Sequence, residues 1–245
     1  MGLLSTNYAI ISDIHSNLEA FERTLLEIDS MGVDKIVCLG DIVGYGASPN
    51  ECLDIVRERQ VTSIIGNHDM VACGRGEPYN FNPIARNAAL WTRNELTEEN
   101  RDFLFSLPHQ REIEDFLIVH GAISDPDLYI FSSSEAFLEF NLMIKAKICF
   151  FGHTHVKVYY VYSHGRVEGF TDNEVELSGE KLYLVNPGSV GQPRDGDPRA
   201  SFLIYEHDEK AIKFFRLEYD IMTAQEKIIA AGLDKRLAYR LSMGM

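Results

Sequence analysis

The first part of the chain alternates between short apolar runs and longer amphipathic segments. Apolar, partly β-branched runs at 8–11, 35–39 and 61–65 predict three buried strands. Apolar residues recur at helical spacing in 18–28 and 49–58, which predicts a helix after each of the first two strands. A strand–helix–strand–helix–strand order predicts a parallel sheet with covering helices.

Residues 70–108 interrupt this order. A loop that contains glycine and proline comes first, and amphipathic segments at 84–94 and 98–107 predict two helices. We interpret the whole segment as a helical cap inserted into the sheet-forming part of the chain. After the cap, two strands are predicted at 116–119 and 148–151, with a helix between them at 134–145.

Beyond residue 155 the pattern changes to short strand-like segments with turns between them. They lie at 156–162, 167–170, 181–185, 201–205 and 212–217. Their close spacing predicts antiparallel hairpins that form a second sheet. Residues 223–231 and 233–241 predict a C-terminal helical extension over 218–245. Because no linker or internal repeat separates these regions, we expect a single domain over 1–245, of the α/β (α+β) class.

The composition changes this picture in one respect, which is charge. The formal net charge of −14 argues against binding duplex nucleic acid, whose phosphates the surface would repel. An acidic protein can still handle phosphate groups where metal ions supply positive charge locally.

The four cysteines show no CxxC spacing, so no disulfide framework or zinc knuckle is expected. The sequence shows no signal peptide or apolar run of membrane-spanning length, so we expect a cytoplasmic protein with no membrane partner.

Polar side chains that can bind metal ions follow five of the predicted strands. They are Asp13 and His15, Asp41, Asn67 and His68, His120, and His153 and His155. Because the carboxyl ends of parallel strands meet at one edge of a sheet, we expect these side chains to lie together. Carboxylate, imidazole and amide groups suit Mn²⁺, Fe²⁺ or Zn²⁺. The space between such strand ends fits two ions roughly 3.5–4 Å apart.

Each of these residues also has a structural explanation when it is taken singly. Asp13 could cap the following helix, Asp41 could brace the turn at Gly40, and His120 could be a buried structural histidine. The explanations would all have to hold at once, and at the same edge of one sheet. That coincidence favours a dinuclear metal site.

Five motifs in this order resemble those of the calcineurin-like metallophosphoesterases. They are Asp13-Ile14-His15, Gly40-Asp41, Gly66-Asn67-His68-Asp69, His120-Gly121 and Gly152-His153-Thr154-His155. The resemblance extends over about residues 8–206. The stretches 40–46 and 186–194 resemble a small bacterial and archaeal branch of that family. The resemblance implies a four-layer αββα sandwich of two mixed sheets.

The resemblance also implies roles for the residues of the motifs. Asp13, His15 and His155 would hold one divalent metal ion, Asn67, His120 and His153 would hold a second, and Asp41 would bridge them. A hydroxide between the ions would attack the phosphorus of a phosphodiester, a phosphomonoester or a nucleotide phosphoanhydride. His68, oriented by Asp69, would protonate the leaving oxygen or stabilise the transition state. Mn²⁺ is the first expectation for the metal, with Fe, Zn, Ni or Co as alternatives.

The segment after Asp41 departs from the protein Ser/Thr phosphatases of the family. It reads Val43-Gly44-Tyr45-Gly46 and lacks the arginine that clamps phosphate there, which disfavours a protein phosphatase. Arg194 and Arg199 are candidate substitutes, with exposed charges near a turn as the alternative explanation.

Three residues are assigned to substrate binding: Arg194, Arg75 and Tyr45. Arg75 and Arg86 would let the cap hold a nucleotide, so the expected substrate is a small phosphorylated molecule, with nucleotides among the candidates. A non-catalytic scaffold with this fold and a DNA nuclease are the competing hypotheses. The intact motif at 66–69 disfavours the scaffold, and the net charge disfavours the nuclease. Homo-oligomerisation stays open.

Overall fold

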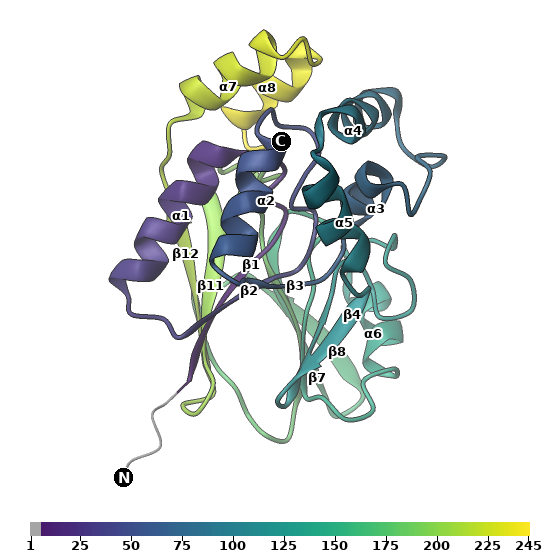
Figure 1. Cartoon of the computed structure of the whole chain (residues 1–245). Helices are drawn as coiled ribbons and strands as arrows, with labels where there is room; N and C mark the ends of the chain where they lie inside the picture. The colour runs from purple at the N-terminus through teal and green to yellow at the C-terminus, as the bar shows by residue number, and fades with distance from the viewer. Residues whose placement is uncertain (1–5) are drawn as a thin grey trace.

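The computed structural model describes residues 6–245, and its strands form two six-stranded sheets packed face to face (Figure 1). The first sheet contains, from edge to edge, β3 (Thr62–Ser63), β2 (Lys35–Cys38), β1 (Asn7–Ile11), β11 (Ala200–Glu206), β12 (Ala211–Leu217) and β9 (Glu174–Glu176). The second contains β4 (Gln110–Ile113), β5 (Phe116–Val119), β6 (Ile148–Phe150), β10 (Leu182–Pro187), β7 (Lys157–Ser163) and β8 (Arg166–Phe170). Both sheets combine parallel and antiparallel pairs.

The alternation of side chains along β1 explains why the sheets stack. Tyr8 and Ile10 pack with Phe116 of the second sheet, while Ala9 and Ile11 belong to the apolar cluster beneath the helices. Successive side chains of a strand point to opposite faces, so a strand that is apolar throughout is buried on both faces.

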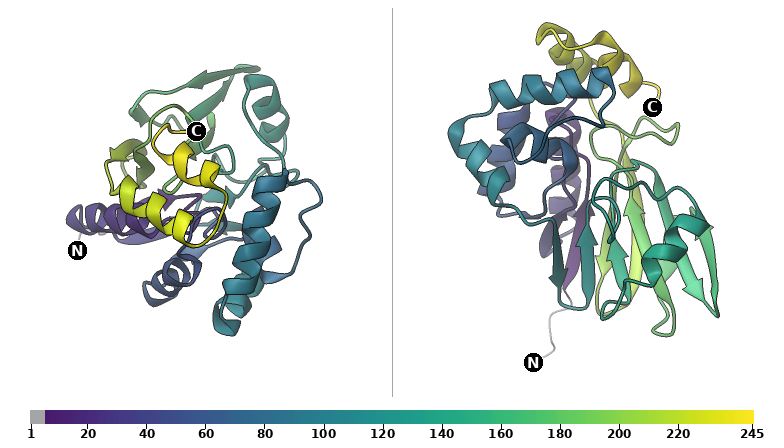
Figure 2. Two further views of the ribbon diagram at one scale, coloured as in Figure 1. Left: turned by 90° about the horizontal axis from the view of Figure 1, so that it is seen from above. Right: turned by 90° about the vertical axis from the view of Figure 1, so that its right-hand side faces the viewer.

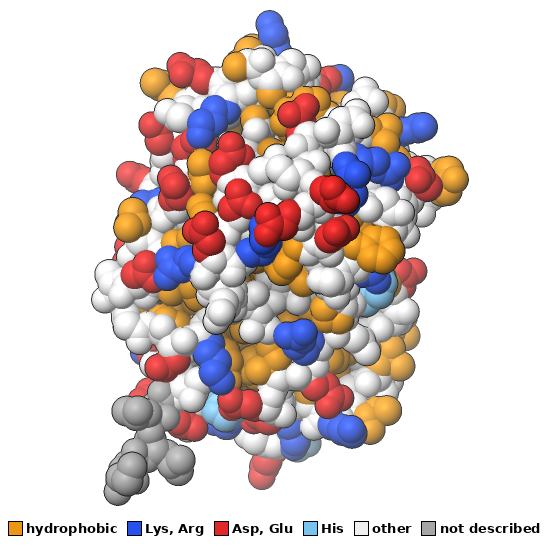
Figure 3. All heavy atoms as spheres, in the orientation of Figure 1, with side chains coloured by type: hydrophobic (Ala, Val, Ile, Leu, Met, Phe, Trp, Pro, Cys, Tyr) orange, Lys and Arg blue, Asp and Glu red, His pale blue; other side chains and the backbone are white. Residues whose placement is uncertain are grey.

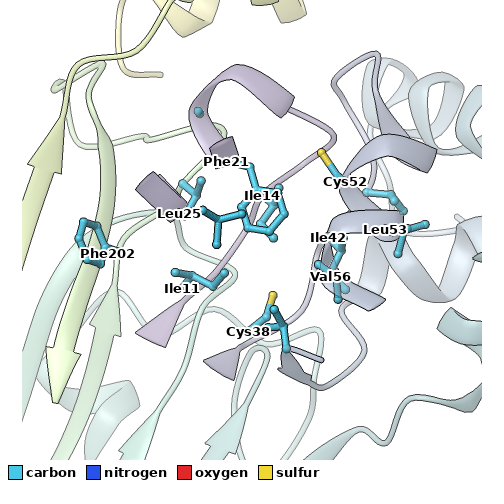
Figure 4. Packing of buried hydrophobic residues seen from close by; sticks show 14 of the residues in the cluster. Ile11, Ile14, Phe21, Leu25, Cys38, Ile42, Cys52, Leu53, Val56 and Phe202 are labelled. Atoms are coloured by element: carbon cyan, nitrogen blue, oxygen red, sulfur yellow. The ribbon is translucent and has the colours of Figure 1, made fainter. Parts of the chain in front are cut away.

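Helices cover the two outer faces of the sheets. They are α1 (Leu18–Ser30) and α2 (Pro49–Glu58) on the first sheet and α6 (Ser133–Phe140) on the second. Figure 4 shows Phe21 of α1 and Leu53 of α2 in the cluster that also contains Phe202 of β11. The order helix, sheet, sheet, helix confirms the predicted αββα sandwich.

The assignment of strands to sheets differs from the prediction. β5 and β6 lie in the second sheet with β10, whereas β11 and β12 complete the first sheet beside β1. Ile10 of β1 is paired with Leu203 of β11, for example. The prediction was wrong because the alternation of apolar residues identifies a strand and not its partner.

Several boundaries also differ. The helix predicted at 134–145 ends at Phe140, and β4 and β9, whose residues are mostly exposed, were not predicted. The motif at 66–69 begins a helix, α3 (Asn67–Cys73), which Asp69 caps by accepting a hydrogen bond from the Gly66 backbone N–H.

Two helical units meet at the top of the sandwich in Figure 2. One contains α3, α4 (Pro83–Glu95) and α5 (Glu98–Ser106), and the other is a hairpin of α7 (Ile221–Ala230) and α8 (Lys235–Leu241). Ala85 and Ala88 of α4 share an apolar cluster with Ile228, Leu237 and Tyr45. The cap and the C-terminal hairpin therefore converge on Tyr45.

The surface is mixed in character. Figure 3 shows acidic and basic side chains interspersed on the face over α1, α2 and α5, with acidic side chains prominent. Among the helices of residues 6–245, none combines the length and apolar character needed to cross a membrane.

Candidate metal centre

Carboxylate and imidazole side chains converge at one end of the sandwich in two groups. Group one contains Asp13, His15 and His155, and group two contains Asp41, His120 and His153. Within each group the ligand atoms lie within 4.8 Å of one another, and all six residues are buried. Group one follows β1 and β6, and group two follows β2, β5 and β6. The expectation of a single sheet edge is therefore corrected, because both sheets contribute strand ends.

Five of these residues have a left-handed backbone conformation, which directs their side chains toward the centre. The φ angles are 54° at Asp13, 49° at His15, 50° at Asp41, 66° at His153 and 59° at His155. Such values are uncommon for residues other than glycine and cost free energy, so they cluster where function requires them. They reverse the chain at each strand end, which is how two residues separated by one position reach the same centre.

Three of the histidines are fixed in orientation by backbone carbonyl groups. The Nδ1 atom of His15 lies 3.0 Å from the backbone oxygen of Val43. The Nδ1 atom of His120 lies 2.9 Å from that of Leu39, and the Nδ1 atom of His155 lies 2.5 Å from that of Gln192. A carbonyl oxygen only accepts hydrogen bonds, so each Nδ1 is the donor, and each Nε2 can present a lone pair to the centre once it carries no proton. This outer-shell arrangement is typical of histidines that bind metal ions.

The two carboxylates are anchored in a similar way. Asp41 accepts a hydrogen bond from the His68 backbone N–H through Oδ1, at 2.9 Å, and Asp13 accepts one from the His153 N–H through Oδ2, at 3.1 Å. The other oxygen of each carboxylate faces the centre. Asp41 Oδ2 lies 3.6 Å from His15 Nε2 and 3.3 Å from His120 Nε2, so it stands between the two groups.

The donor atoms fit two divalent cations. The Nε2 atoms of His15 and His155 face each other at 3.1 Å, an arrangement in which two lone pairs repel unless a cation or proton lies beside them. Within residues 6–245, Asp13 Oδ1 and His153 Nε2 are buried without a hydrogen-bond partner. The Asn67 amide oxygen lies 3.1 Å from His120 Nε2 and adds a neutral oxygen ligand to group two.

The charges of the site favour a cation as well. Burial raises the pKa of the Asp41 carboxyl, but His120, His68 and His15 together outweigh burial and hold this pKa well below its usual range. Burial lowers the pKa of His120, yet Asp41 raises it to about 10. Burial lowers the pKa of His153 to about 3. The carboxylates are thus in the form that binds metal ions, and a cation at His120 would displace its proton.

His68 and Asp69 do not form the pair that the resemblance implied. The Asp69 carboxylate accepts hydrogen bonds from the backbone N–H groups of Val43 and Gly66, each at 3.0 Å, so it braces the loop after β2 against α3. Among the described residues His68 Nδ1 has no partner. The His68 ring is instead held by Tyr45, with ring centroids 4.3 Å apart, and by Phe81 at 4.6 Å. Burial lowers the pKa of His68 to about 4.

The three residues assigned to substrate binding lie in different places. Tyr45 is buried between His15 and His68, and the Arg194 guanidinium carbon lies 5.6 Å from the Tyr45 ring centroid. Arg75 lies elsewhere: its guanidinium donates to the backbone oxygens of Phe105 and Leu107 at the end of α5. The structure therefore brings Tyr45 and Arg194 to the site but not Arg75, whose donors hold the cap together.

A cavity of about 120 Å³ opens over group two. It is lined by Tyr45, Asn67, His68, Asn80, Phe81, Asn82, Ala85, Asp127, Tyr129 and His153. Sequence analysis missed Tyr129, whose ring stacks on His153 with centroids 3.9 Å apart, and Asp127. Both lie in the irregular loop after His120, where no periodicity marks their position. Only their proximity to a motif could have drawn attention to them.

A two-sheet sandwich with carboxylates and histidines at one end is an architecture of metal-dependent phosphoesterases. The chain belongs to the calcineurin-like phosphoesterase superfamily, because the model of this superfamily's domain matches residues 7–210. The family implies divalent metal ions, and its activity supports a hydrolase.

Three similar proteins extend over the whole chain. The crystal structure of a metallophosphoesterase from Sphaerobacter thermophilus is 41% identical, with a TM-score of 0.87 over 98% of this chain and 100% of that one. An uncharacterized protein of Methanocaldococcus jannaschii is 38% identical over 99% of this chain and 100% of its own. A hypothetical protein from Pyrococcus horikoshii OT3, 18% identical, shares the fold with a TM-score of 0.83 over 98% and 99% of the two chains.

Proposed function

We propose that this protein hydrolyses a small phosphate ester or phosphoanhydride with two divalent metal ions. The observation that carries this proposal is the position of Asp41 Oδ2 between the two groups, together with Asp13 Oδ1 and His153 Nε2, which have no hydrogen-bond partner among residues 6–245. A shared carboxylate offsets the repulsion between two neighbouring cations. Mn²⁺ is the first metal to test, because the donor set combines carboxylates with imidazoles and contains no thiolate.

The residues of the two groups would divide the metal ions between them. Group one would hold one ion, group two with Asn67 would hold the other, and Asp41 would contact both. Bound divalent ions supply positive charge to a phosphoryl group and activate water for attack at neutral pH. The buried carboxylates and imidazoles keep the ligand atoms in place, so little reorganisation accompanies the reaction.

Two side chains are proposed to act on the substrate itself. His68 lines the cavity beside Asn67 and His153. There its neutral imidazole would donate a hydrogen bond to the leaving oxygen, or a proton once the negative charge of the bound phosphate favours the protonated ring. Arg194 would contact the phosphoryl oxygens: within residues 6–245 its Nε is buried without a partner, and its Nη2 donates to Gln192 Oε1 at 2.9 Å. Arg194 would thus take the place of the arginine that the loop after Asp41 lacks.

The size of the cavity supports a small substrate. About 120 Å³ lined by Phe81, Asn82 and Tyr129 suits a phosphoryl group and the atoms next to it in a small ester better than a folded phosphoprotein. A nucleotide is therefore retained as a candidate substrate.

The test is metal-dependent hydrolysis by the purified protein. After removal of metal by a chelator, we expect added Mn²⁺ to restore hydrolysis of p-nitrophenyl phosphate or bis(p-nitrophenyl) phosphate, with about two ions bound per chain. His155→Gln should lose this response, whereas the matched change His164→Gln, at an exposed histidine, should keep it. Binding of two ions without hydrolysis of either ester would overturn the assignment of a hydrolase.

A further inference from the structure

Two arginines from distant parts of the chain lie beside the same ring in the site. Arg194 is in the loop after β10, and Arg240 is on α8 of the C-terminal hairpin. Their guanidinium carbons lie 5.6 and 5.9 Å from the centroid of the Tyr45 ring. That ring in turn contacts His15 and His68, with centroids 4.7 and 4.3 Å away. One aromatic ring therefore separates Arg240 from the candidate metal centre.

These two arginines differ from most others in a strongly acidic chain. Within residues 6–245, ion pairs with Asp or Glu occupy Arg23, Arg57, Arg59, Arg93, Arg199, Arg216 and Arg236. In the same range neither Arg194 nor Arg240 pairs with a carboxylate side chain. Arg240 donates through Nε to the backbone oxygen of Met245, which leaves its terminal nitrogens free among the described residues.

Burial makes this arrangement costly without an anion. Burial lowers the pKa of the Arg240 guanidinium, and repulsion by Arg194 lowers it further. Two partly buried guanidinium groups beside one aromatic ring are stabilised when anionic oxygens lie near them.

The hairpin that carries Arg240 is firmly attached to the site. Lys227 of α7 forms an ion pair with Glu19 of α1, and the Asn17 amide donates to the Tyr219 hydroxyl at 3.2 Å. Leu241, next to Arg240 in the sequence, is buried in the apolar cluster that contains Tyr45. The guanidinium is thus presented by a packed helix and not by a free chain end.

A second cavity of about 410 Å³ lies beside Arg240. It shares Tyr45, Asn82 and Ala85 with the cavity over group two and continues along Leu237 and Arg240. Its remaining lining consists of Arg236 and of the largely apolar Ile84, Tyr239, Met243 and Met245. A ligand could therefore extend from the metal centre past Tyr45 into this space.

We propose that Arg240 binds a second phosphoryl group of the substrate, adjacent to the one that is hydrolysed, and that the organic part of the substrate occupies the larger cavity. The substrate class is then a diphosphate or bisphosphate of an organic molecule. This inference rests on the proposed function, since it places the hydrolysed group at the metal centre. An arginine recognises phosphate oxygens through paired N–H donors, so it discriminates strongly between ligands with and without that group.

The test compares two ligands that differ by one phosphoryl group. The dissociation constants of α,β-methylene-ADP, which is not hydrolysed at its bridge, and of AMP are measured by titration calorimetry with the metal-loaded protein. We expect the wild type to prefer the diphosphate analogue by roughly 10-fold or more, as for a hydrogen bond to a charged group. Arg240→Gln should lose most of that preference while leaving AMP binding within about 2-fold, by the same reasoning.

Two further variants complete the test. Lys235→Gln is the control on α8, because Lys235 is an exposed cation that lines neither of the two cavities, and it should keep the wild-type preference. Arg240→Lys should restore part of the preference that is lost in Arg240→Gln. Such a partial recovery would show that the loss in Arg240→Gln is not caused by misfolding. A wild type without preference for the diphosphate analogue, or an unchanged preference in Arg240→Gln, would overturn the inference. Hydrolysis of bis(p-nitrophenyl) phosphate by the same samples tests the proposed function separately, because that ester has no second phosphoryl group.

Discussion

Histidine and carboxylate side chains gather at both ends of the sandwich, and the two ends differ in how those side chains are satisfied. At the end opposite the candidate metal centre, His207 Nε2 lies 2.8 Å from Asp115 and 3.4 Å from Glu114, and its Nδ1 lies 3.3 Å from Asp208. Lys210 is paired with Asp115 at 2.8 Å. These carboxylates are half exposed, and each histidine nitrogen faces an acceptor.

The candidate metal centre reverses each of these properties. Its residues are buried, the Nε2 atoms of His15 and His155 face each other, and Asp13 Oδ1 has no hydrogen-bond partner among the described residues. The comparison teaches that residue types alone do not define a metal site. A cluster that is suited to bind a cation is buried, has lone pairs directed inward and lacks hydrogen-bond partners for some of its polar atoms. A solvated network of ion pairs has none of these properties.

The largest effect is expected from the carboxylate shared by the two groups. Asp41→Asn should remove most of the bound metal and nearly all hydrolysis, because an amide cannot offset the repulsion of two cations. Metal analysis and a phosphoesterase assay measure both effects. Asp208→Asn, at the opposite end, is the control and should change neither. Two ions bound at wild-type affinity in Asp41→Asn would refute the bridging role.

A smaller loss is expected where a side chain meets the substrate and not the metal. His68→Gln should keep both ions and lower kcat by roughly 10²–10⁴-fold, the range of general acid–base catalysis. The loss should shrink for a nitrophenolate leaving group, which needs little protonation. If good and poor leaving groups suffer equally, His68 stabilises the transition state in some other way than by proton donation.

A glycine tests how tightly the centre is packed. A Cβ atom at Gly66 would overlap Asp41 Oδ1, so Gly66→Ala must displace that carboxylate. We expect a loss of stability of about 1–3 kcal/mol, as for other overpacked sites, and a metal affinity roughly 10–100-fold lower, as when an outer-shell contact is lost. Thermal unfolding and metal titration measure these. Gly179→Ala, which meets no neighbour, is the control; equal behaviour of the two variants would show that the centre tolerates the shift.

The smallest effect belongs to the exposed network at the other end. Burial raises the pKa of the Asp115 carboxyl, but hydrogen bonds from Lys210 and His207 outweigh burial and lower it. A lowered pKa stabilises the folded state above the pKa of the unfolded chain, and this contribution disappears as the pH falls through the folded pKa. Asp115→Asn should therefore cost less than about 1 kcal/mol at pH 7, and the difference from wild type should vanish in acid. Denaturant unfolding of both proteins at pH 7 and pH 3 measures this difference in the free energy of unfolding. A larger difference at pH 7, or one that stays the same at pH 3, would contradict the prediction.

The sequence predicted which polar residues lie together at the candidate metal centre better than it predicted their surroundings. Asp13, His15 and His155 could be identified because each lies directly after a predicted strand, and strand ends meet in open sheets. The role of Asp69 could not, because its partners Val43 and Gly66 are brought near only by packing of the loop after β2. Metal-ligand roles for these residues remain a prediction, whereas the αββα fold is confirmed.

Basic residues were harder to interpret from sequence than ligands. Arg75 and Arg93 both lie near the motif in the chain, yet their guanidinium groups bind backbone oxygens of Leu107 and Val71 inside the cap. Arg240 lies far from every motif and still reaches Tyr45. Spacing along the chain does not reveal which N–H donors of an arginine are already hydrogen-bonded within the fold, so the positions of these guanidinium groups could not be predicted from the sequence.

The pairing of β1 with β11 has a consequence for how the protein is made. Strand β1 leads into Asp13 and has two neighbours in the sheet, β2 and β11. The partner of Asn7 in β11 is Glu206, so this edge of β1 cannot be paired until most of the chain has been made. At synthesis rates of about 5–20 residues per second, the ribosome needs on the order of ten seconds or more to supply that partner. Until then the first ligands emerge on an incomplete sheet. Most of the chain thus has to be synthesised before the nascent protein can bind metal in the native arrangement.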